Sequence, residues 1–321
     1  MQHEKVIIIG SGPSGLTAAL YTARANLNPL VFVGHQFGGQ AALTHEIENY
    51  PGFVEAISGA ELAERMREQA ERFGARYEYA SVTEVDFKNG RPFRIKDENG
   101  KEYLADTVVV TAGADPRKLG VSGEKEYTGK GVSYCGTCDG FFFRGKHIIV
   151  VGGGDSAIEE GIFLTRFASK VDVVHRRDSL RAGQLLQDRA FKNEKMSFIW
   201  NTVIEEVVGN GKVDHVRLRN LQTNEVYDYA ADGVFVFIGH DPNSSIYTGQ
   251  VEMEDGYIVT DKHMMSSVPG VFAAGEIQDP IYRQVATSVG QGTAAAMSLE
   301  RWLSHQEAVE AREAEKAETS A

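Results

Sequence analysis

Two glycine-rich turns, each lying between an apolar run and a helical pattern, constrain the fold of this 321-residue chain more than any other feature. The first turn, GSGPSG at 10–15, follows the apolar run 6–9, and the second, GGGDSA at 152–157, follows the β-branched run 148–151. In such a unit glycines permit the tight turn and let the backbone approach a pyrophosphate, while free N–H groups at the helix start hold its charge. Because the unit occurs twice, we expect an α/β fold with two dinucleotide-binding domains.

The residues after the second strand of each unit indicate which dinucleotide it binds. In the second unit the segment KVDVVHRRDSLR brings together four basic side chains, His175, Arg176, Arg177 and Arg181. Guanidinium groups suit a phosphate, which a carboxylate would repel, so the pattern favours NADPH over NADH. A solvated basic patch that also contains Asp178 is the alternative interpretation. In the first unit the strand ends in Val33, Gly34 and His35, without the acid that usually bonds a ribose hydroxyl.

The charge balance and the apolar pattern argue against several functional classes. The formal net charge of −12 disfavours nucleic acid or an anionic membrane as the main partner. No uninterrupted apolar run reaches the roughly 18 residues that a membrane-spanning helix needs. The chain passes directly from a few polar residues into the first glycine turn and has only 2 cysteines. We therefore expect neither a signal peptide nor a secreted disulfide framework, and we predict a cytoplasmic protein.

Both cysteines lie in the segment GVSYCGTCDGFFFRGK, where Asp139 directly follows Cys138. A structural zinc site needs four ligands, and the sequence has neither a second CxxC nor a spaced histidine pair, so no metal is expected. An inert core pair would not account for the glycines beside the cysteines or for the acid. We interpret Cys135 and Cys138 as a redox dithiol, because the CxxC setting lowers the pKa of one thiol. Asp139 would then exchange a proton as the dithiol forms.

A hydride accepted from NADPH usually passes to a flavin, so the first unit is predicted to hold FAD. Residues 37–53 combine a glycine pair with Gln40 and Asn49, whose amides are able to bond ribityl or ring atoms, although an ordinary polar loop would look similar. In residues 270–303 a short strand ends at a Gly-Glu pair and a long helical pattern begins near 283–284. That helix start would stabilise an anionic reduced ring, whereas the alternative is a packing helix alone.

The second unit lies inside the sequence of the first, so the first domain is expected to be discontinuous. GADP at 113–116 and GHDP at 239–242 are turn sequences that mark the two crossings, and adjacent crossings are typical of a hinge. We predict an FAD-binding domain at 1–115 and 242–321 and an NADPH-binding domain with the CxxC at 116–241. His240 is interpreted as a turn residue without a catalytic role. The Ala/Glu-rich tail after residue 303 is predicted to be a fraying helix end.

Taken together, these segments resemble the low-molecular-weight thioredoxin reductase family of the bacterial and archaeal type. The resemblance covers residues 5–303 and rests on GSGPSG, GGQ…ENYPGF, CGTCDG, GGGDSA, HRRDSLR, FIGHDPN and FAAGEIQDPIYRQVATSVGQG in this order. It implies two Rossmann-like domains. It also implies FAD contacts at Gly10, Gly12, Ser14, Gly15, Gly39, Gln40, Asn49, Gly275, Glu276, Arg283, Gln284 and Val285. The NADPH contacts implied are Gly154, Asp155, Ser156, His175, Arg176, Arg177 and Arg181.

The resemblance also implies the activity and the partner. Electrons would pass from NADPH through FAD to the Cys135–Cys138 disulfide, with Asp139 as the acid, and then to thioredoxin or a thioredoxin-like protein. Rotation of the domains and a homodimer are implied as well. The sequence departs from the family in having Glu276 in place of aspartate and Gly136 in place of the more common alanine. The alternatives are an FAD-dependent dithiol oxidase, a ferredoxin-fed reductase and a flavin-binding redox sensor, all of which the NADPH motifs disfavour.

Overall fold

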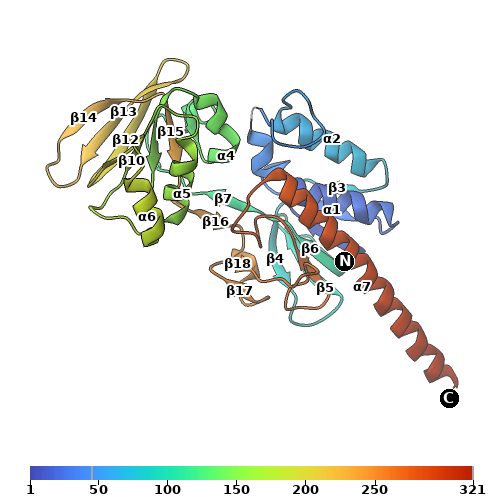
Figure 1. Cartoon of the computed structure of the whole chain (residues 1–321). Helices are drawn as coiled ribbons and strands as arrows, with labels where there is room; N and C mark the ends of the chain where they lie inside the picture. Colours follow the sequence, from blue (N-terminus) through green and yellow to red (C-terminus); the bar gives the residue numbers. More distant parts are fainter. Residues whose placement is uncertain (45, 320–321) are drawn as a thin grey trace. The chain divides into compact units, whose positions relative to one another are not determined.

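In the computed structural model, which describes residues 1–44 and 46–319, the chain forms two compact units (Figure 1). Unit 1 comprises residues 1–115 and the chain from Asp241 onward, and unit 2 comprises Pro116–His240. Unit 2 is therefore an insertion in unit 1. The second crossing lies between His240 and Asp241, one residue before the predicted boundary.

The main sheet of unit 1 is seven-stranded and largely parallel. Its parallel strands are β3 (Arg76–Glu78), β2 (Leu30–Phe32), β1 (Gln2–Ile9), β6 (Glu102–Val110) and β19 (Val271–Ala273), the last pairing with β6. The antiparallel strands β5 (Phe93–Asp97) and β4 (Val82–Asp86) extend it beyond β6. The sheet is accompanied by α1 (Pro13–Arg24), α2 (Gly59–Glu71), α7 (Val285–Thr319), η1 (Gly39–Leu43), η3 (Ser245–Tyr247), β17 (Met253–Glu254) and β18 (Tyr257–Ile258).

Strand β1 is apolar at its end because both of its faces are buried. Val6 and Ile8 pack with alanines of α1 and α7, while Ile7 and Ile9 pack with Phe93 on the opposite face. Successive side chains of a strand point to opposite faces, so a parallel strand covered on both sides reads as a continuous apolar run. The run that identified the first unit in the sequence is therefore a direct consequence of this burial.

Unit 2 contains a fully parallel five-stranded sheet and a separate antiparallel one. The parallel sheet has the order β11 (Met196–Ile199), β10 (Lys170–Val174), β9 (His147–Val151), β15 (Gly233–Val236) and β8 (Val132–Ser133). Its helical segments are α3 (Glu124–Tyr127), α4 (Gly136–Asp139), η2 (Gly140–Phe143), α5 (Asp155–Leu164) and α6 (Gln184–Phe191). The antiparallel sheet consists of β12 (Thr202–Gly209), β13 (Val213–Asn220) and β14 (Val226–Ala230). The predicted α/β fold with two dinucleotide-binding domains, one inserted in the other, is confirmed.

Parallel strands place their carboxyl ends at one edge of a sheet, and ligands of such folds bind there. In unit 1 the first glycine turn follows β1, and residues 33–35 and 275–276 follow β2 and β19. In unit 2 the second glycine turn follows β9, His175 follows β10 and the cysteine segment follows β8. These segments thus lie at one edge of each parallel sheet.

Two local predictions need correction. Helix α7 begins at Val285, because Arg283 has a φ of 50°, outside the helical region, and it continues through the tail to Thr319. The last two residues of the tail, 320–321, lie outside the described residues. The crossing segments are not simple turns, since β7 (Ala114–Pro116) and β16 (His240–Pro242) pair as a two-stranded sheet. Among the described residues no helix is long and apolar enough to span a membrane.

Candidate dinucleotide and redox sites

The first glycine turn leaves an open space at Gly12 and is tightly packed elsewhere. A Cβ at Gly15 would lie 2.1 Å from the carbonyl oxygen of Gly10, and a Cβ at Gly10 would lie 2.3 Å from that of Thr111. A Cβ at Gly12 would meet no atom within 4 Å, and Gly12 directly precedes the first residue of α1. The space beside this helix start therefore fits the pyrophosphate of a dinucleotide, which the free N–H groups of the first turn would bind.

Ser11 joins this turn to the loop after β2. Its hydroxyl donates to the carbonyl of Val33 (2.9 Å) and accepts from the N–H of Gly38 (3.3 Å). As a result Gly39, where φ is 60°, is held so close that a Cβ on it would lie 3.2 Å from the Cα of Gly12. At the end of β2, where an acid is absent, the ring of His35 lies 3.2 Å from the hydroxyl of Ser81.

The segment after β19 packs directly on the start of α1. A Cβ at Gly275 would lie 2.5 Å from the hydroxyl oxygen of Ser14, and one at Gly292 would lie 2.3 Å from its carbonyl oxygen. Gln291 fixes the segment, since its side chain accepts from the N–H of Gly275 (3.0 Å) and donates to Asp279 (2.8 Å). Glycines at both positions are required because α7 and the strand-end turn approach the α1 backbone this closely.

Glu276 is a largely buried carboxyl in unit 1. Burial raises its pKa to about 7, although the positive charge of Arg283 opposes this shift. The carboxylates of Asp279 and Asp115 raise the pKa further. Because the unfolded chain would ionise near the ordinary value of 4.5, Glu276 makes folding less favourable as pH rises from that value through 7. A hydroxyl-rich ligand that donates hydrogen bonds to the carboxylate would offset this penalty.

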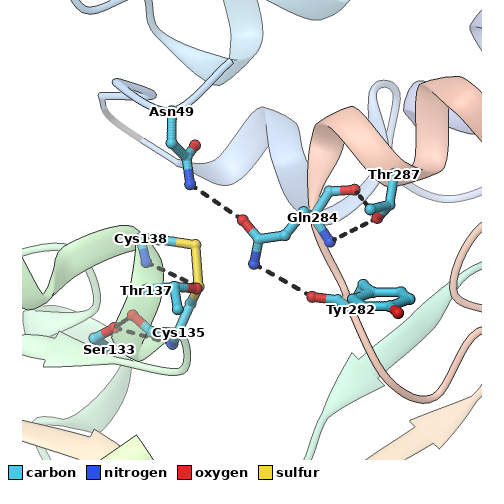
Figure 2. Close-up of a disulfide and its surroundings, with 8 residues drawn as sticks. All are labelled: Asn49, Ser133, Cys135, Thr137, Cys138, Tyr282, Gln284 and Thr287. Atoms are coloured by element: carbon cyan, nitrogen blue, oxygen red, sulfur yellow. Dashed lines mark hydrogen bonds between the residues drawn. A yellow bond between two sulfur atoms is a disulfide. The ribbon is translucent and has the colours of Figure 1, made fainter. Parts of the chain in front are cut away.

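The amide side chains expected to contact the flavin are connected within unit 1, as Figure 2 shows. The Asn49 amide donates to Oε1 of Gln284 (3.1 Å), and Nε2 of Gln284 donates to the carbonyl of Tyr282 (3.3 Å). The N–H of Gln284 and the hydroxyl of Thr287 lie 3.3 Å apart at the start of α7. Gln40 instead donates to the carboxylate of Asp115. These contacts orient polar groups beside the start of a long helix, which suits the polar edge of a ring with developing negative charge.

The second glycine turn repeats the open position of the first. Gly154 directly precedes α5, and the nearest atom to a Cβ placed on it is a guanidinium nitrogen of Arg181, 3.9 Å away. The carboxylate of Asp155 accepts from the N–H of Gly183 (2.7 Å), and the N–H of Arg181 donates to the carbonyl of Gly153 (2.7 Å). These bonds bring the arginine-containing loop to the helix start, so a phosphate at α5 would meet both N–H groups and a guanidinium.

His175 lies under this turn and is buried, whereas the predicted arginines and Ser156 are exposed. A Cβ at Gly153 would lie 2.3 Å from the imidazole ring, so the ring packs against the turn itself. Burial lowers the pKa of His175, and the positive charges of Arg181, Arg177 and Arg176 lower it further. None of the three guanidinium groups forms an ion pair within the described part of the chain. This cluster of exposed guanidinium groups fits a phosphate monoester.

The cysteines form a disulfide at the start of α4, drawn in Figure 2. The bond is 2.05 Å long, and the Cα atoms are 5.3 Å apart. Ser133 shapes the turn, because its hydroxyl accepts from the N–H of Cys135 (3.1 Å) and donates to the carbonyl of the same residue (3.2 Å). The N–H of Cys138 donates to Sγ of Cys135 (3.2 Å), an arrangement that would stabilise a thiolate at Cys135.

Asp139 is a largely buried acid next to this disulfide. Burial raises its pKa, while a hydrogen bond with Ser133 opposes the shift. The acid therefore keeps its proton to higher pH than an exposed aspartate does, and it can supply that proton to a sulfur that gains negative charge. Ser133 contacts both Cys135 and Asp139. It was not predicted, because a single serine before a CxxC carries no distinctive spacing.

Residues 4–292 match the model of a protein family described as pyridine nucleotide-disulphide oxidoreductase. The chain belongs to this family. It is similar to the thioredoxin reductase of Bacillus subtilis, with 49% identity over 94% of this chain and 96% of the relative. It is also similar to the thioredoxin reductase of Mycolicibacterium smegmatis, with 51% identity over 94% of this chain and 97% of the relative. A crystal structure of thioredoxin reductase from Streptococcus pyogenes matches with a TM-score of 0.90, 46% identity and coverage of 94% and 99%.

The predicted resemblance is thereby confirmed along nearly the whole chain. The pyridine nucleotide-disulphide oxidoreductases use FAD and a nicotinamide dinucleotide, so the prediction of FAD and NADPH is confirmed at the level of the family. The individual contact residues remain predictions, which the geometry of the two glycine turns supports.

We expect alanine at Gly12 and at Gly15 to have different effects. At Gly15 the new Cβ would collide with a backbone carbonyl, so the free energy of unfolding should fall by about 1–3 kcal/mol, with or without flavin. At Gly12 the Cβ points into open space, so the apoprotein should unfold like the wild type but retain less flavin. Urea unfolding of the apoproteins and the ratio of flavin to protein absorbance measure the two effects. Equal flavin retention by Gly12→Ala and the wild type would contradict the pyrophosphate assignment.

Proposed function

We propose that this protein is an NADPH-dependent flavoprotein disulfide reductase that acts on thioredoxin or a thioredoxin-like protein. The observation that carries this proposal is the Cys135–Cys138 disulfide, which follows β8 at the same sheet edge as the arginine-flanked nucleotide turn. The names of the similar proteins support the same substrate. When bound, the two cofactors supply hydride transfer from NADPH to FAD and an electron pair to the disulfide.

The residues of the chain manage the protons and the sulfur chemistry. Opening the Cys135–Cys138 bond takes two electrons and two protons and gives two thiols. Asp139 would supply the proton to the sulfur that leaves, and the N–H of Cys138 would stabilise negative charge on Cys135. A thiolate of the pair then attacks the partner's disulfide, forming a mixed disulfide and breaking the partner's S–S bond. Attack by the second thiol releases the partner as a dithiol and restores the Cys135–Cys138 bond.

The surface next to the disulfide suits a protein substrate. Phe141 and Phe142 follow the redox turn directly, and they are 52% and 37% exposed. The guanidinium of Arg144 lies 4.9 Å from the ring centre of Phe141. Adjacent exposed aromatic side chains are costly in water, and such patches commonly bind other proteins. The exposed aromatic pair therefore supports a disulfide of a protein as the substrate.

An anaerobic titration with NADPH tests the proposed function. We expect about one equivalent to bleach the flavin absorbance after the disulfide has been reduced, and oxidised thioredoxin to restore it. NADH at the same concentration serves as the control for cofactor choice. A flavin that NADPH does not bleach would contradict the proposal and favour a dithiol oxidase or a ferredoxin-fed reductase. Bleaching that no thioredoxin reverses would leave a flavoprotein with another acceptor.

Two further assignments belong to the proposal. We infer a cytoplasmic location, because small secreted domains are typically rich in disulfides whereas this chain has only 2 cysteines. We infer a homodimer from the family resemblance. Sedimentation equilibrium of the flavin-loaded protein measures the second, and a monomer mass near 35.2 kDa at micromolar concentration would contradict it.

We expect Asp139→Asn to lower thioredoxin turnover by about 10²-fold, as loss of a general acid does. Reduction of the flavin by NADPH should be unaffected. Because the pKa of Asp139 is raised, wild-type turnover should fall as pH rises through that pKa, whereas the residual turnover of the variant should lack this step. Burial of Asp139 also lowers the unfolding free energy of the wild type as pH rises from the ordinary pKa of 3.8 through the raised pKa, and Asn removes this loss. Turnover profiles from pH 5 to 9 that coincide in shape would contradict the role.

A further inference from the structure

The CxxC turn is in contact with an acidic side chain that the mechanism does not use. Helix α5 begins at the nucleotide turn and passes α4, where Glu160 faces Gly136, the first residue between the cysteines. A Cβ placed on Gly136 would lie 2.1 Å from Oε2 of Glu160 and 3.3 Å from its carboxyl carbon. The residue is half-buried, and its Oε2 atom, the one nearest Gly136, is buried.

Gly136 permits this approach by lacking a side chain. Its backbone is helical, a conformation that any residue adopts, and the remaining neighbour of a new Cβ would be Phe237 at an ordinary 3.5 Å. The glycine is therefore not required by the backbone or by a rigid neighbour. Its consequence is that one flexible carboxylate reaches the redox turn, and an alanine at this position would displace it.

We propose that Gly136 admits Glu160 to the redox turn, and that the Glu160 carboxylate makes the thiols formed from the disulfide less acidic. A negative charge near a thiol disfavours the thiolate, which is the nucleophilic form. Glu160 is thus a positioning residue that acts through the sulfurs. It would hold the reduced pair as thiols until a partner disulfide arrives, which slows oxidation of the free dithiol.

Other charged groups of unit 2 lie on the turn, after η2 or on α5. Asp139 lies on the turn itself, and Arg144 follows η2 with its guanidinium on the ring of Phe141. On α5, Glu159 neighbours Glu160 in sequence but is exposed. Asp155 lies at the far end of the helix, where it is bonded to Gly183. Glu159 is therefore a matched control, because it is the same type of residue at the adjacent position of α5 but is exposed.

The test measures thiol acidity directly in the flavin-loaded protein. The disulfide is reduced with dithiothreitol under argon, excess reductant is removed, and alkylation by iodoacetamide is followed by mass spectrometry from pH 5 to 10. We expect Glu160→Gln to lower the apparent thiol pKa by about one unit. Below that pKa alkylation should be about threefold faster, because a tenfold gain in thiolate is partly offset by its lower nucleophilicity. Glu159→Gln should titrate like the wild type.

Gly136→Ala provides an independent route to the same effect, since it changes no charge and moves the carboxylate by steric contact. We expect it to shift the thiol pKa in the same direction, and we expect the double variant Gly136→Ala/Glu160→Gln to shift it no further than Glu160→Gln alone. Additive shifts would overturn the proposal, because the two changes would then act separately. A profile of Glu160→Gln that coincides with the wild type, or an equal shift in Glu159→Gln, would overturn it too.

This inference rests on the proposed function only in taking the cysteine pair as redox-active. The alkylation assay uses neither NADPH nor thioredoxin, so the two proposals fail separately. Absence of NADPH-dependent thioredoxin reduction with a normal Glu160 effect would contradict the function alone. Normal turnover without a Glu160 effect would contradict the inference alone.

Discussion

Replacing Cys138 by serine is expected to lower thioredoxin reduction by at least about 10³-fold while NADPH still bleaches the flavin. The disulfide is the only route in the proposed mechanism from the flavin to a protein partner, and a single remaining thiol cannot form it again. The nucleotide turn and the arginine loop belong to other segments of the chain, so cofactor binding should be intact. Stopped-flow flavin reduction and steady-state thioredoxin reduction measure the two steps separately.

Two companion variants make this result interpretable. Cys135→Ser should cause a loss of similar size, because the mechanism needs both sulfurs. Thr137→Ser, an exposed position between the cysteines, should leave turnover within about twofold of the wild type, as conservative surface changes do. The expected loss of 10³-fold corresponds to about 4 kcal/mol of transition-state stabilisation. Retention of more than about a tenth of the activity by either cysteine variant would contradict the mechanism.

The sequence was sufficient for features whose chemistry is local. A glycine turn between an apolar run and a helix indicates a strand, a phosphate site and a helix start together. Strand β1 could be predicted because its burial on both faces makes it a continuous apolar run. The redox pair could also be predicted, because the spacing of the two cysteines brings their sulfurs within bonding distance in a helical turn.

Contacts between distant segments were not predictable. Gly292 packs on Ser14, which lies 278 residues away in the sequence, and no pattern in either segment predicts this contact. The predicted start of α7, near 283–284, was one to two residues early, because periodicity does not reveal that Arg283 adopts a positive φ. Nothing in the sequence singles out Glu160, and only the fold brings its carboxylate to Gly136. Side-chain chemistry was thus predictable at the motif level, whereas its tuning by neighbours was not.

The arginine loop should decide the choice of nicotinamide cofactor. We expect the variant Arg176→Ala/Arg177→Ala/Arg181→Ala to raise the KM for NADPH by about 10²-fold or more, since each charge-assisted bond contributes about 1.5–3 kcal/mol. The KM for NADH should change little, because it lacks the phosphate that these groups would bind. Arg189→Ala, which removes an exposed charge from the neighbouring helix α6, is the matched control. Equal increases in KM for both cofactors would contradict a phosphate role.

A second measurement on the same variant tests the electrostatics without any cofactor. The pKa of His175 is lowered first by its burial and then by the positive charges of the three arginines, so the ring is neutral at pH 7 and the arginines carry the binding charge. Removing them leaves the burial but not the charges, so the pKa should rise part of the way toward its ordinary value. Titration of the imidazole signals by NMR measures this shift. An unchanged pKa would mean that the arginine charges do not act at this turn, and the preference for NADPH would then need another origin.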